Sequence, residues 1–159
     1  MFGKKKNDGR PGIDEYFMKI CEDVARRSTC KRHNFGAAIV KDKQILATGY
    51  NGAPKGLPHC IDTECIRDKL GIPSGTHHEI CAAVHAEQNA ILQCAYHGIS
   101  TKDATLYVNA SPCRICAKMI VNSGIKKVIY AGEYLDSETF KLFKHAGVKI
   151  QKLESNPKG

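Results

Sequence analysis

The amino-acid sequence predicts an α/β fold, a three-layer α/β/α sandwich around a mixed five-stranded sheet. Two short apolar runs come early and are separated by a few polar residues, which is typical of a β-hairpin. The later apolar runs are each preceded by a segment with helical periodicity. Strand–helix–strand connections favour parallel pairing with a right-handed crossover. The hairpin and the crossovers together therefore predict a sheet with both antiparallel and parallel pairs.

The first half of the chain supplies one helix and the hairpin. Over 13–28, apolar residues recur at helical spacing and predict an amphipathic helix. The hairpin strands are expected over 35–40 and 44–48, with Lys41-Asp42-Lys43 as the turn. An irregular stretch that opens with Gly and Pro then runs from 49 to about 78. A connection of this length in a compact domain usually has a function or is pinned by other contacts.

The second half is expected to alternate helices with strands. The predicted elements are a helix over 81–96, a strand over 104–109, a helix over 113–122, a strand over 127–131, a helix over 138–146 and a strand over 148–153. Ser137 is the predicted N-cap of the last helix, which Gly147 would end. His85 would lie in the first turns of the helix over 81–96. Cys21 and Cys94 fall on helix faces and are assigned to the core.

Length and composition predict a single soluble domain. The 159 residues divide into a flexible basic tail (1–12), the domain (13–153) and a flexible C-terminal tail (154–159). A hydrophobic share of 42% and a charged share of 25% are typical of globular proteins, and no apolar run is long enough to span a membrane. The basic N-terminal segment leads into polar residues rather than an apolar signal core, so a cytoplasmic protein is expected.

The net charge of +8 narrows the choice of partners only in part. A basic balance fits nucleic acid, an anionic small substrate, or solubility alone. The sequence has no dense run of Lys and Arg interleaved with aromatic residues, the pattern that would favour nucleic acid. A nucleic-acid partner is therefore disfavoured, and no membrane partner is expected.

A catalytic zinc site is the strongest chemical signal in the sequence. His85 and Glu87 form a His-x-Glu triplet, and a Pro-Cys-x-x-Cys segment follows at 112–116. This combination is the signature of the zinc deaminases. Zinc takes His and Cys ligands in a tetrahedral shell, and a catalytic site leaves the fourth position to water. The predicted zinc ligands are therefore His85, Cys113 and Cys116, with Glu87 beside the open position.

A Cys-x-x-Cys pair alone would also fit a structural zinc or a redox pair. The histidine and the glutamate decide between these interpretations. A structural site has no use for a glutamate two residues after its histidine, whereas deamination needs a group that moves protons. Zinc would activate the attacking water. Glu87 would carry the proton of that water to the ring and then to the departing amine. The Cys pair is expected at a helix N-terminus, which favours thiolates.

The chain resembles the deoxycytidylate deaminase family, including its bacterial late-competence-operon members, over roughly residues 13–150. The matching segments are 29–30 (TC), 35–40 (FGAAIV), 49–52 (GYNG), 85–91 (HAEQNAI) and 111–118 (SPCRICAK). The resemblance implies a cytidine-deaminase-like α/β/α fold and a zinc-dependent hydrolase that converts dCMP to dUMP and ammonia for thymidylate synthesis. It also implies a homo-oligomer, with a hexamer favoured, activation by dCTP with Mg²⁺, and inhibition by dTTP.

The resemblance also implies substrate contacts. By position, Asn51 would contact the sugar, and Ala86, Ser111 and Tyr134 would line the nucleotide pocket. Asn51 equally fits a turn residue beside a glycine, and Tyr134 equally fits a position packed on the surface. Basic residues flanking the expected pocket are either phosphate contacts or ordinary solvated side chains: Arg26, Arg27, Lys31 and Lys55.

A second, structural zinc is implied because some members of the family carry one. The matching positions begin with Cys30 and Cys60, and the predicted set is completed by Cys65 and Cys81. Three histidines in the same stretch compete for the remaining places: His59, His77 and His78. Such a metal would pin the long irregular stretch. The alternative is that these side chains are separate free thiols and imidazoles.

Three rival functions compete with dCMP deamination. A tRNA adenosine deaminase shares the zinc motif, but the Gly-Tyr-Asn-Gly segment at 49–52 and the lack of a basic C-terminal helix argue against it. A free-nucleoside deaminase usually carries a cysteine where His85 stands. A non-enzymatic, competence-linked zinc module would not need Glu87.

Overall fold

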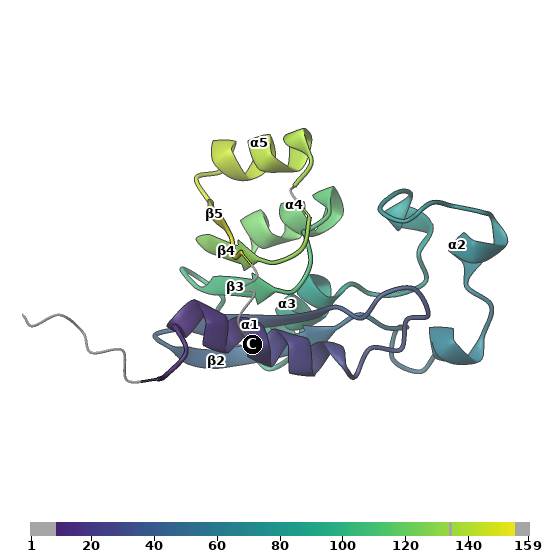
Figure 1. Cartoon of the computed structure of the whole chain (residues 1–159), viewed down its shortest axis with the longest axis horizontal. Coiled ribbons are helices and arrows are strands. Elements are labelled where there is room, and N and C mark those ends of the chain that lie inside the picture. Colours follow the sequence, from purple (N-terminus) through teal and green to yellow (C-terminus); the bar gives the residue numbers. More distant parts are fainter. Residues whose placement is uncertain (1–8, 134, 155–159) are drawn as a thin grey trace, which may run out of the picture.

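Five strands form one mixed sheet in the order β2-β1-β3-β4-β5 (Figure 1). β1 (Gly36–Lys41) pairs antiparallel with both β2 (Gln44–Tyr50) and β3 (Thr105–Val108). β4 (Lys127–Tyr130) runs parallel to β3, and β5 (Lys149–Lys152) runs parallel to β4. The computed structural model describes residues 9–133 and 135–154. Over these residues the predicted mixed sheet is confirmed.

One face of the sheet is covered by α1 (Ile13–Ala25), which begins at the predicted residue but ends three residues early. Its buried side chains Phe17 and Cys21 pack against Tyr107 and neighbouring apolar residues of the sheet. The helix can lie this close to β1 because position 36 is glycine. A Cβ at Gly36 would lie 2.1 Å from the carbonyl oxygen of Cys21, well inside any allowed contact.

The opposite face carries the larger core and the three remaining long helices, α3 (Ala86–Tyr96), α4 (Arg114–Asn122) and α5 (Ser137–His145). Alternate residues of the strands point into this core, as expected for a sheet buried on both faces. α5 lies beyond α4 and packs on β5 at the edge of the sheet (Figure 1). The predicted three-layer sandwich is therefore confirmed. In the described part of the chain, no helix is long and apolar enough to cross a membrane.

The prediction that a helix begins at Cys81 is wrong, because α3 begins at Ala86. Val84 instead pairs with Gly52 in an isolated β-bridge, with hydrogen bonds of 3.1 Å and 2.8 Å between their backbones. His85 has extended backbone angles and is the N-cap, and its backbone N–H donates to Gln88 Oε1 at 2.8 Å. His85 therefore lies at the end of an extended segment, not on a helix face.

The N-cap of α5 also differs from the prediction. Asp136 is the capping residue, and Ser137 is the first residue of the helix. Asp136 Oδ1 accepts hydrogen bonds from the backbone N–H groups of Glu138 at 3.1 Å and Thr139 at 3.0 Å. A carboxylate favours this position because it satisfies free N–H groups and interacts well with the positive end of the helix dipole. The ends of the remaining predicted elements agree to within two residues.

Residues 51–84, here called the long connection, extend away from the sandwich (Figure 1). They contain only the short helices η1 (Cys60–Asp62), α2 (Ile66–Lys69) and η2 (His78–Ile80). Two arginines hold this segment together. Both Nη atoms of Arg32 donate to the carbonyl of Ile72 at 3.0 Å, and buried Arg67 donates to the carbonyls of Pro73 and Thr76. The predicted irregular stretch is thus confirmed, and arginine side chains fix part of it.

Candidate metal centre

The predicted zinc ligands come together from the starts of two helices. His85 is the N-cap of α3, Cys113 is the N-cap of α4, and Cys116 lies in the first turn of α4. His85 Nδ1 lies 3.5 Å from Cys113 Sγ and 3.3 Å from Cys116 Sγ. The backbone N–H of Cys116 points to Cys113 Sγ at 3.5 Å, which is the favourable environment for a thiolate that a helix N-terminus provides.

These distances fit a zinc ion. Zinc binds sulfur at about 2.3 Å and imidazole nitrogen at about 2.0 Å, so a tetrahedral ion holds its nitrogen and sulfur ligand atoms about 3.5 Å apart. The observed nitrogen–sulfur separations of 3.5 Å and 3.3 Å match this value. One imidazole and two thiolates also match the ligand types that zinc prefers. His85 Nδ1 therefore lies at distances from both thiols that suit a shared zinc ion, and the starts of α3 and α4 position the three side chains.

Glu87 lies beside the three ligands and is almost completely buried, with 5% of its surface exposed. A carboxylate oxygen of Glu87 lies within 4.8 Å of the ligand atoms of His85 and Cys116. Burial raises the pKa of this carboxyl to about 7, against opposing contributions from its own backbone N–H and from His85. A carboxyl with a pKa near neutrality can both accept and return a proton, which is what general acid–base chemistry requires.

The other groups of the centre are strongly coupled. A hydrogen bond from Cys116 lowers the pKa of Cys113 to about 3, while the same bond raises the pKa of Cys116. Although burial opposes it, hydrogen bonds to Cys113 and Cys81 raise the pKa of His85 to about 10. A dication would favour two thiolates and a neutral imidazole.

The predicted substrate contacts have definite places in the structure. Asn51 is buried, and its side-chain amide accepts from Phe35 N–H at 2.8 Å and donates to the carbonyl of His33 at 2.9 Å. Ala86 is fully buried in the first turn of α3. Ser111 Oγ donates to the carbonyl of Glu133. The last predicted contact, Tyr134, lies outside the described residues.

The four cysteines predicted for a second zinc approach one another less closely. Burial raises the pKa of Cys60, and so does the charge of the neighbouring Cys30, Cys81 and Cys65, so the four thiols occupy one region. However, the groups of three or more candidate ligands that lie within 4.8 Å in the described chain do not include them. Cys21 and Cys94 are buried in the two cores, which confirms the prediction for both.

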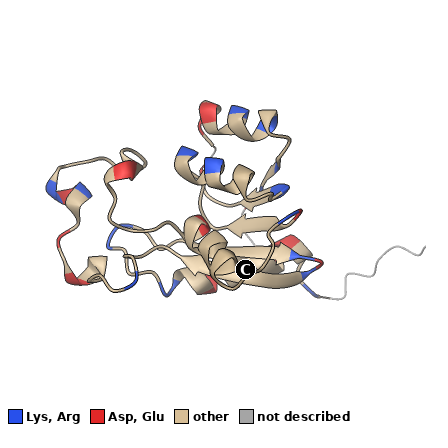
Figure 2. Ribbon diagram, turned by 180° about the vertical axis from the view of Figure 1, so that it is seen from behind, with Lys and Arg blue, Asp and Glu red and all other residues tan. Residues whose placement is uncertain are grey.

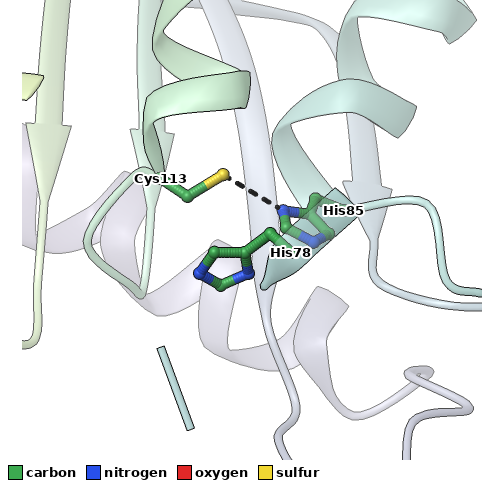
Figure 3. Close-up of side chains that lie close together, drawn as sticks. All are labelled: His78, His85 and Cys113. Carbon is green, nitrogen blue, oxygen red and sulfur yellow. Dashed lines mark hydrogen bonds between the residues drawn. The ribbon is translucent and has the colours of Figure 1, made fainter. Parts of the chain in front are cut away.

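One residue joins the metal centre that the sequence did not place there. His78, from η2 of the long connection, lies with a ring nitrogen within 4.8 Å of the ligand atoms of His85 and Cys113 (Figure 3). Burial lowers the pKa of His78. The sequence grouped it with His59 and His77 as a competitor for the second zinc. Its spacing of seven residues from His85 gave no signal, because the extended segment between them brings the two rings together only in the fold.

The basic residues that flank the expected pocket stay on the surface. Arg26, Arg27, Lys31 and Lys55 are all exposed, and Arg26 pairs with Asp23 at 3.6 Å. Figure 2 shows the Lys and Arg positions spread over the helices, the strand ends and the long connection rather than gathered on one element.

Comparisons with known proteins agree with the geometry. Residues 11–132 match the family described as the cytidine and deoxycytidylate deaminase zinc-binding region. The chain is 38% identical to the deoxycytidylate deaminase of Saccharomyces cerevisiae over 145 residues, which are 91% of this chain and 46% of that protein. It is 41% identical to ComE operon protein 2 of Bacillus subtilis over 143 residues, 89% of this chain and 71% of that protein.

A solved structure extends the comparison to the fold. The dCMP deaminase of cyanophage S-TIM5, in complex with dCMP and dUMP, superposes with a TM-score of 0.75 at 35% identity. The match covers 91% of this chain and 98% of the phage chain. The chain therefore spans about half the length of the yeast relative but nearly all of the phage enzyme.

Proposed function

The chain belongs to the cytidine and deoxycytidylate deaminase family, and we propose that it hydrolyses dCMP to dUMP and ammonia. The single observation that carries the proposal is the approach of His85 Nδ1 to the sulfur atoms of both Cys113 and Cys116, with buried Glu87 beside His85 and Cys116. A structural zinc site does not need the carboxyl, whereas a hydrolytic deaminase does. The choice of dCMP rests on the relatives and on a net charge of +8, which suits an anionic nucleotide.

The residues divide the work between binding a metal and moving protons. His85, Cys113 and Cys116 would hold zinc, which when bound supplies the Lewis acidity that makes water a nucleophile at neutral pH. Glu87 accepts a proton from the attacking water and transfers it to the ring nitrogen next to the amine-bearing carbon. The same carboxyl then takes the remaining proton from the added hydroxyl and gives it to the departing amine, so that water and dCMP give dUMP and ammonia. Its pKa of about 7 suits both directions of transfer.

The nucleotide pocket is proposed to include Asn51, Ala86, Ser111 and Tyr134. The described contacts show how two of them would be held. The amide of Asn51 ties the long connection to the backbone at 33–35, and the hydroxyl of Ser111 is fixed by the Glu133 carbonyl. A sugar contact by Asn51 would therefore come from a side chain that the fold has already oriented. Asn51→Ala should raise KM for dCMP, and an unchanged KM would remove Asn51 from the pocket.

A second, structural zinc is proposed at Cys30, Cys60, Cys65 and Cys81. The mutual influence of these thiols on the pKa of Cys60 supports a common site. A backbone N–H also points to Cys30 Sγ, from Arg32 at 3.4 Å, as is favourable for a thiolate. Zinc would draw the four sulfur atoms together and fix the long connection. Elemental analysis of the purified protein should give two zinc ions per chain, and a single ion would refute the second site.

The assembly and regulation of the protein are proposed from the family resemblance. We expect a cytoplasmic homo-oligomer, a hexamer, that dCTP with Mg²⁺ activates and dTTP inhibits. Light scattering coupled to size-exclusion chromatography measures the assembly. Initial rates with dCMP in the presence of dCTP and Mg²⁺, or of dTTP, measure the regulation. A monomer whose rates respond to neither nucleotide would contradict this part of the proposal.

One assay separates the proposed function from its rivals. Ammonia release should be measured with dCMP, dCTP, deoxycytidine and a tRNA anticodon stem, using protein of known zinc content. The proposal predicts release from dCMP alone among the four. Release from the anticodon stem would indicate a tRNA adenosine deaminase, and release from deoxycytidine a nucleoside deaminase. No release from any of the four would leave a non-enzymatic zinc module.

A further inference from the structure

His78 occupies a place in the metal centre that the proposed reaction does not use. Its ring and that of His85 are 5.2 Å apart between centroids and nearly perpendicular, at 79°. Figure 3 shows the His78 ring beside both His85 and the thiol of Cys113. The ligand atoms of His78, His85 and Cys113 all lie within 4.8 Å of one another. Three side chains that each bind zinc well thus meet at this point.

One nitrogen of the His78 ring lacks a hydrogen-bond partner among the described residues. This atom, Nδ1, is buried. By contrast, the imidazole of the preceding residue, His77, is exposed and pairs with Glu79 Oε1 at 3.1 Å. Buried polar atoms normally have a partner, and an exception indicates local strain, a catalytic role, or a bound water or ion. The ring that carries this unpaired Nδ1 atom lies next to the predicted zinc ligands His85 and Cys113.

His78 and Glu87 lie on different sides of the three predicted zinc ligands. Ligand atoms of His78 group with those of His85 and Cys113, whereas the carboxylate of Glu87 groups with His85 and Cys116. His85 is the member common to both groups. The catalytic carboxyl and the additional imidazole therefore approach the three predicted ligands from the Cys116 side and the Cys113 side respectively.

We propose that His78 is a fourth, displaceable ligand of the metal, which closes the centre in the resting protein and leaves when substrate binds. Two imidazoles and two thiolates form a complete tetrahedral shell, whereas a catalytic shell needs its fourth position open. Ligand atoms of one tetrahedral zinc ion lie about 3.3–3.8 Å apart, so binding would draw His78 toward an ion that Cys116 also holds. The fourth ligand of the resting protein rests on the proposed zinc centre alone, whereas its release by dUMP also rests on the proposed substrate.

The fold explains why this ligand would be the one to leave. His85, Cys113 and Cys116 are fixed at helix starts whose neighbours belong to the main core. His78 instead belongs to a three-residue 3₁₀ helix in the long connection, followed by a short extended segment. A small shift of this segment would withdraw His78 without disturbing the other three ligands.

The direct test is zinc K-edge X-ray absorption of the zinc-loaded protein, which counts imidazole ligands. The resting wild type should have one more imidazole per chain than His78→Ala at equal zinc content. His78→Gln, which keeps much of the side-chain volume, should match His78→Ala. His77→Ala is the matched control, because it removes an adjacent but exposed imidazole, and it should match the wild type. Saturating dUMP should lower the wild-type count by one.

Kinetics with dCMP give a second, independent readout. In the wild type, His78 would occupy the fourth position for part of the time and block substrate. Because His78→Ala removes this block, its kcat/KM should equal that of the wild type or be up to about tenfold higher. An equal imidazole count in the wild type and His78→Ala would refute the ligand. A variant that keeps its zinc but loses about 100-fold in kcat would also refute it, since His78 would then act on the substrate.

The two proposals can fail separately. If the imidazole count is one lower in His78→Ala than in the wild type, but the wild type releases no ammonia from dCMP, the fourth ligand is kept and the proposed substrate is refuted. If the wild type deaminates dCMP but its zinc has a single imidazole ligand both at rest and with saturating dUMP, the proposed substrate is kept and the fourth ligand is refuted.

Discussion

The metal centre at the helix starts and the cysteines of the long connection are held in different ways. His85 Nδ1 lies at tetrahedral distances from two sulfur atoms, because α3 and α4 are both anchored in the main core. Cys30, Cys60, Cys65 and Cys81 belong to irregular segments and have not closed to such distances in the described structure. The fold alone therefore brings the side chains of the first site together, whereas the proposed second site would need its metal to draw the four sulfur atoms together.

The largest expected effect is a loss of turnover, and it tests the chemistry of the metal centre at the helix starts. Glu87→Gln keeps the shape of the side chain but removes its ability to carry a proton, so kcat with dCMP should fall about 1,000-fold. Zinc content should stay at the wild-type level, because Glu87 is not a ligand. Parallel measurement of ammonia release and bound zinc checks both statements. Near-normal turnover in this variant would refute the role of Glu87, and loss of zinc would indicate that it is a ligand.

The next prediction tests whether the two proposed metal sites bind separate zinc ions with different roles. Cys113→Ala should abolish turnover and remove one zinc per chain while leaving the long connection resistant to protease. Cys60→Ala should remove the other zinc and create cleavage sites within 51–84, because a structural metal contributes folding free energy to the segment it binds. Zinc analysis and limited proteolysis with mass spectrometry measure these outcomes. Equal protease sensitivity in the two variants would contradict the distinction.

A pair of glycine substitutions compares the rigidity of the two regions. A Cβ at Gly49 would lie 2.4 Å from both the carbonyl oxygen of Ala86 and the backbone nitrogen of Ala90, so Gly49→Ala must push α3 away from β2. We expect a loss of about 3 kcal/mol in the free energy of unfolding, together with lower activity because His85 moves with α3.

The matched substitution is Gly56→Ala in the long connection. Gly56 has φ +88, and no neighbour lies within 4 Å of the position that a Cβ would take, so only backbone strain opposes the change. The expected cost is about 1 kcal/mol, with turnover of dCMP close to the wild type. Urea unfolding and initial rates compare the two variants. A Gly49→Ala protein as stable and active as Gly56→Ala would contradict the close packing of α3 on the sheet.

The smallest expected effect concerns the N-cap of α5, a helix that supplies no proposed metal ligand. Asp136→Ala removes the side chain that accepts from the N–H groups of Glu138 and Thr139 at the start of α5. Loss of an N-cap costs about 1 kcal/mol, and activity should be unchanged because α5 contributes none of the proposed ligands. Ser137→Ala is the control, since Ser137 was the cap predicted from sequence. A larger loss in Ser137→Ala than in Asp136→Ala would contradict the observed cap.

Sequence patterns predicted what depends on local periodicity and motif spacing. The hairpin, the helix–strand alternation and the ligands His85, Cys113 and Cys116 all fall in this class. The start of α3 was missed because Cys81-Ala82-Ala83-Val84 has helix-compatible residues, while the bridge from Val84 to Gly52 is a tertiary contact. The position of His78 beside His85 was missed for the same reason, because it too depends on a tertiary contact.

Capping shows a second limit of sequence patterns. Asp136 and Ser137 are neighbours and both are good N-caps, so only the backbone conformation distinguishes them. Asn51 illustrates the third limit. Its motif position is compatible with a turn or a sugar contact, and the structure shows a buried amide that already bonds to two backbone groups.

The central claim is that zinc binds at the two helix starts, and anomalous scattering at the zinc edge from a crystal of the protein tests it most directly. The account predicts a strong peak within bonding distance of His85 Nδ1, Cys113 Sγ and Cys116 Sγ, beside the Glu87 carboxylate. A peak found solely among Cys30, Cys60, Cys65 and Cys81 would contradict the account, because the protein would then hold a structural metal and lack a catalytic one.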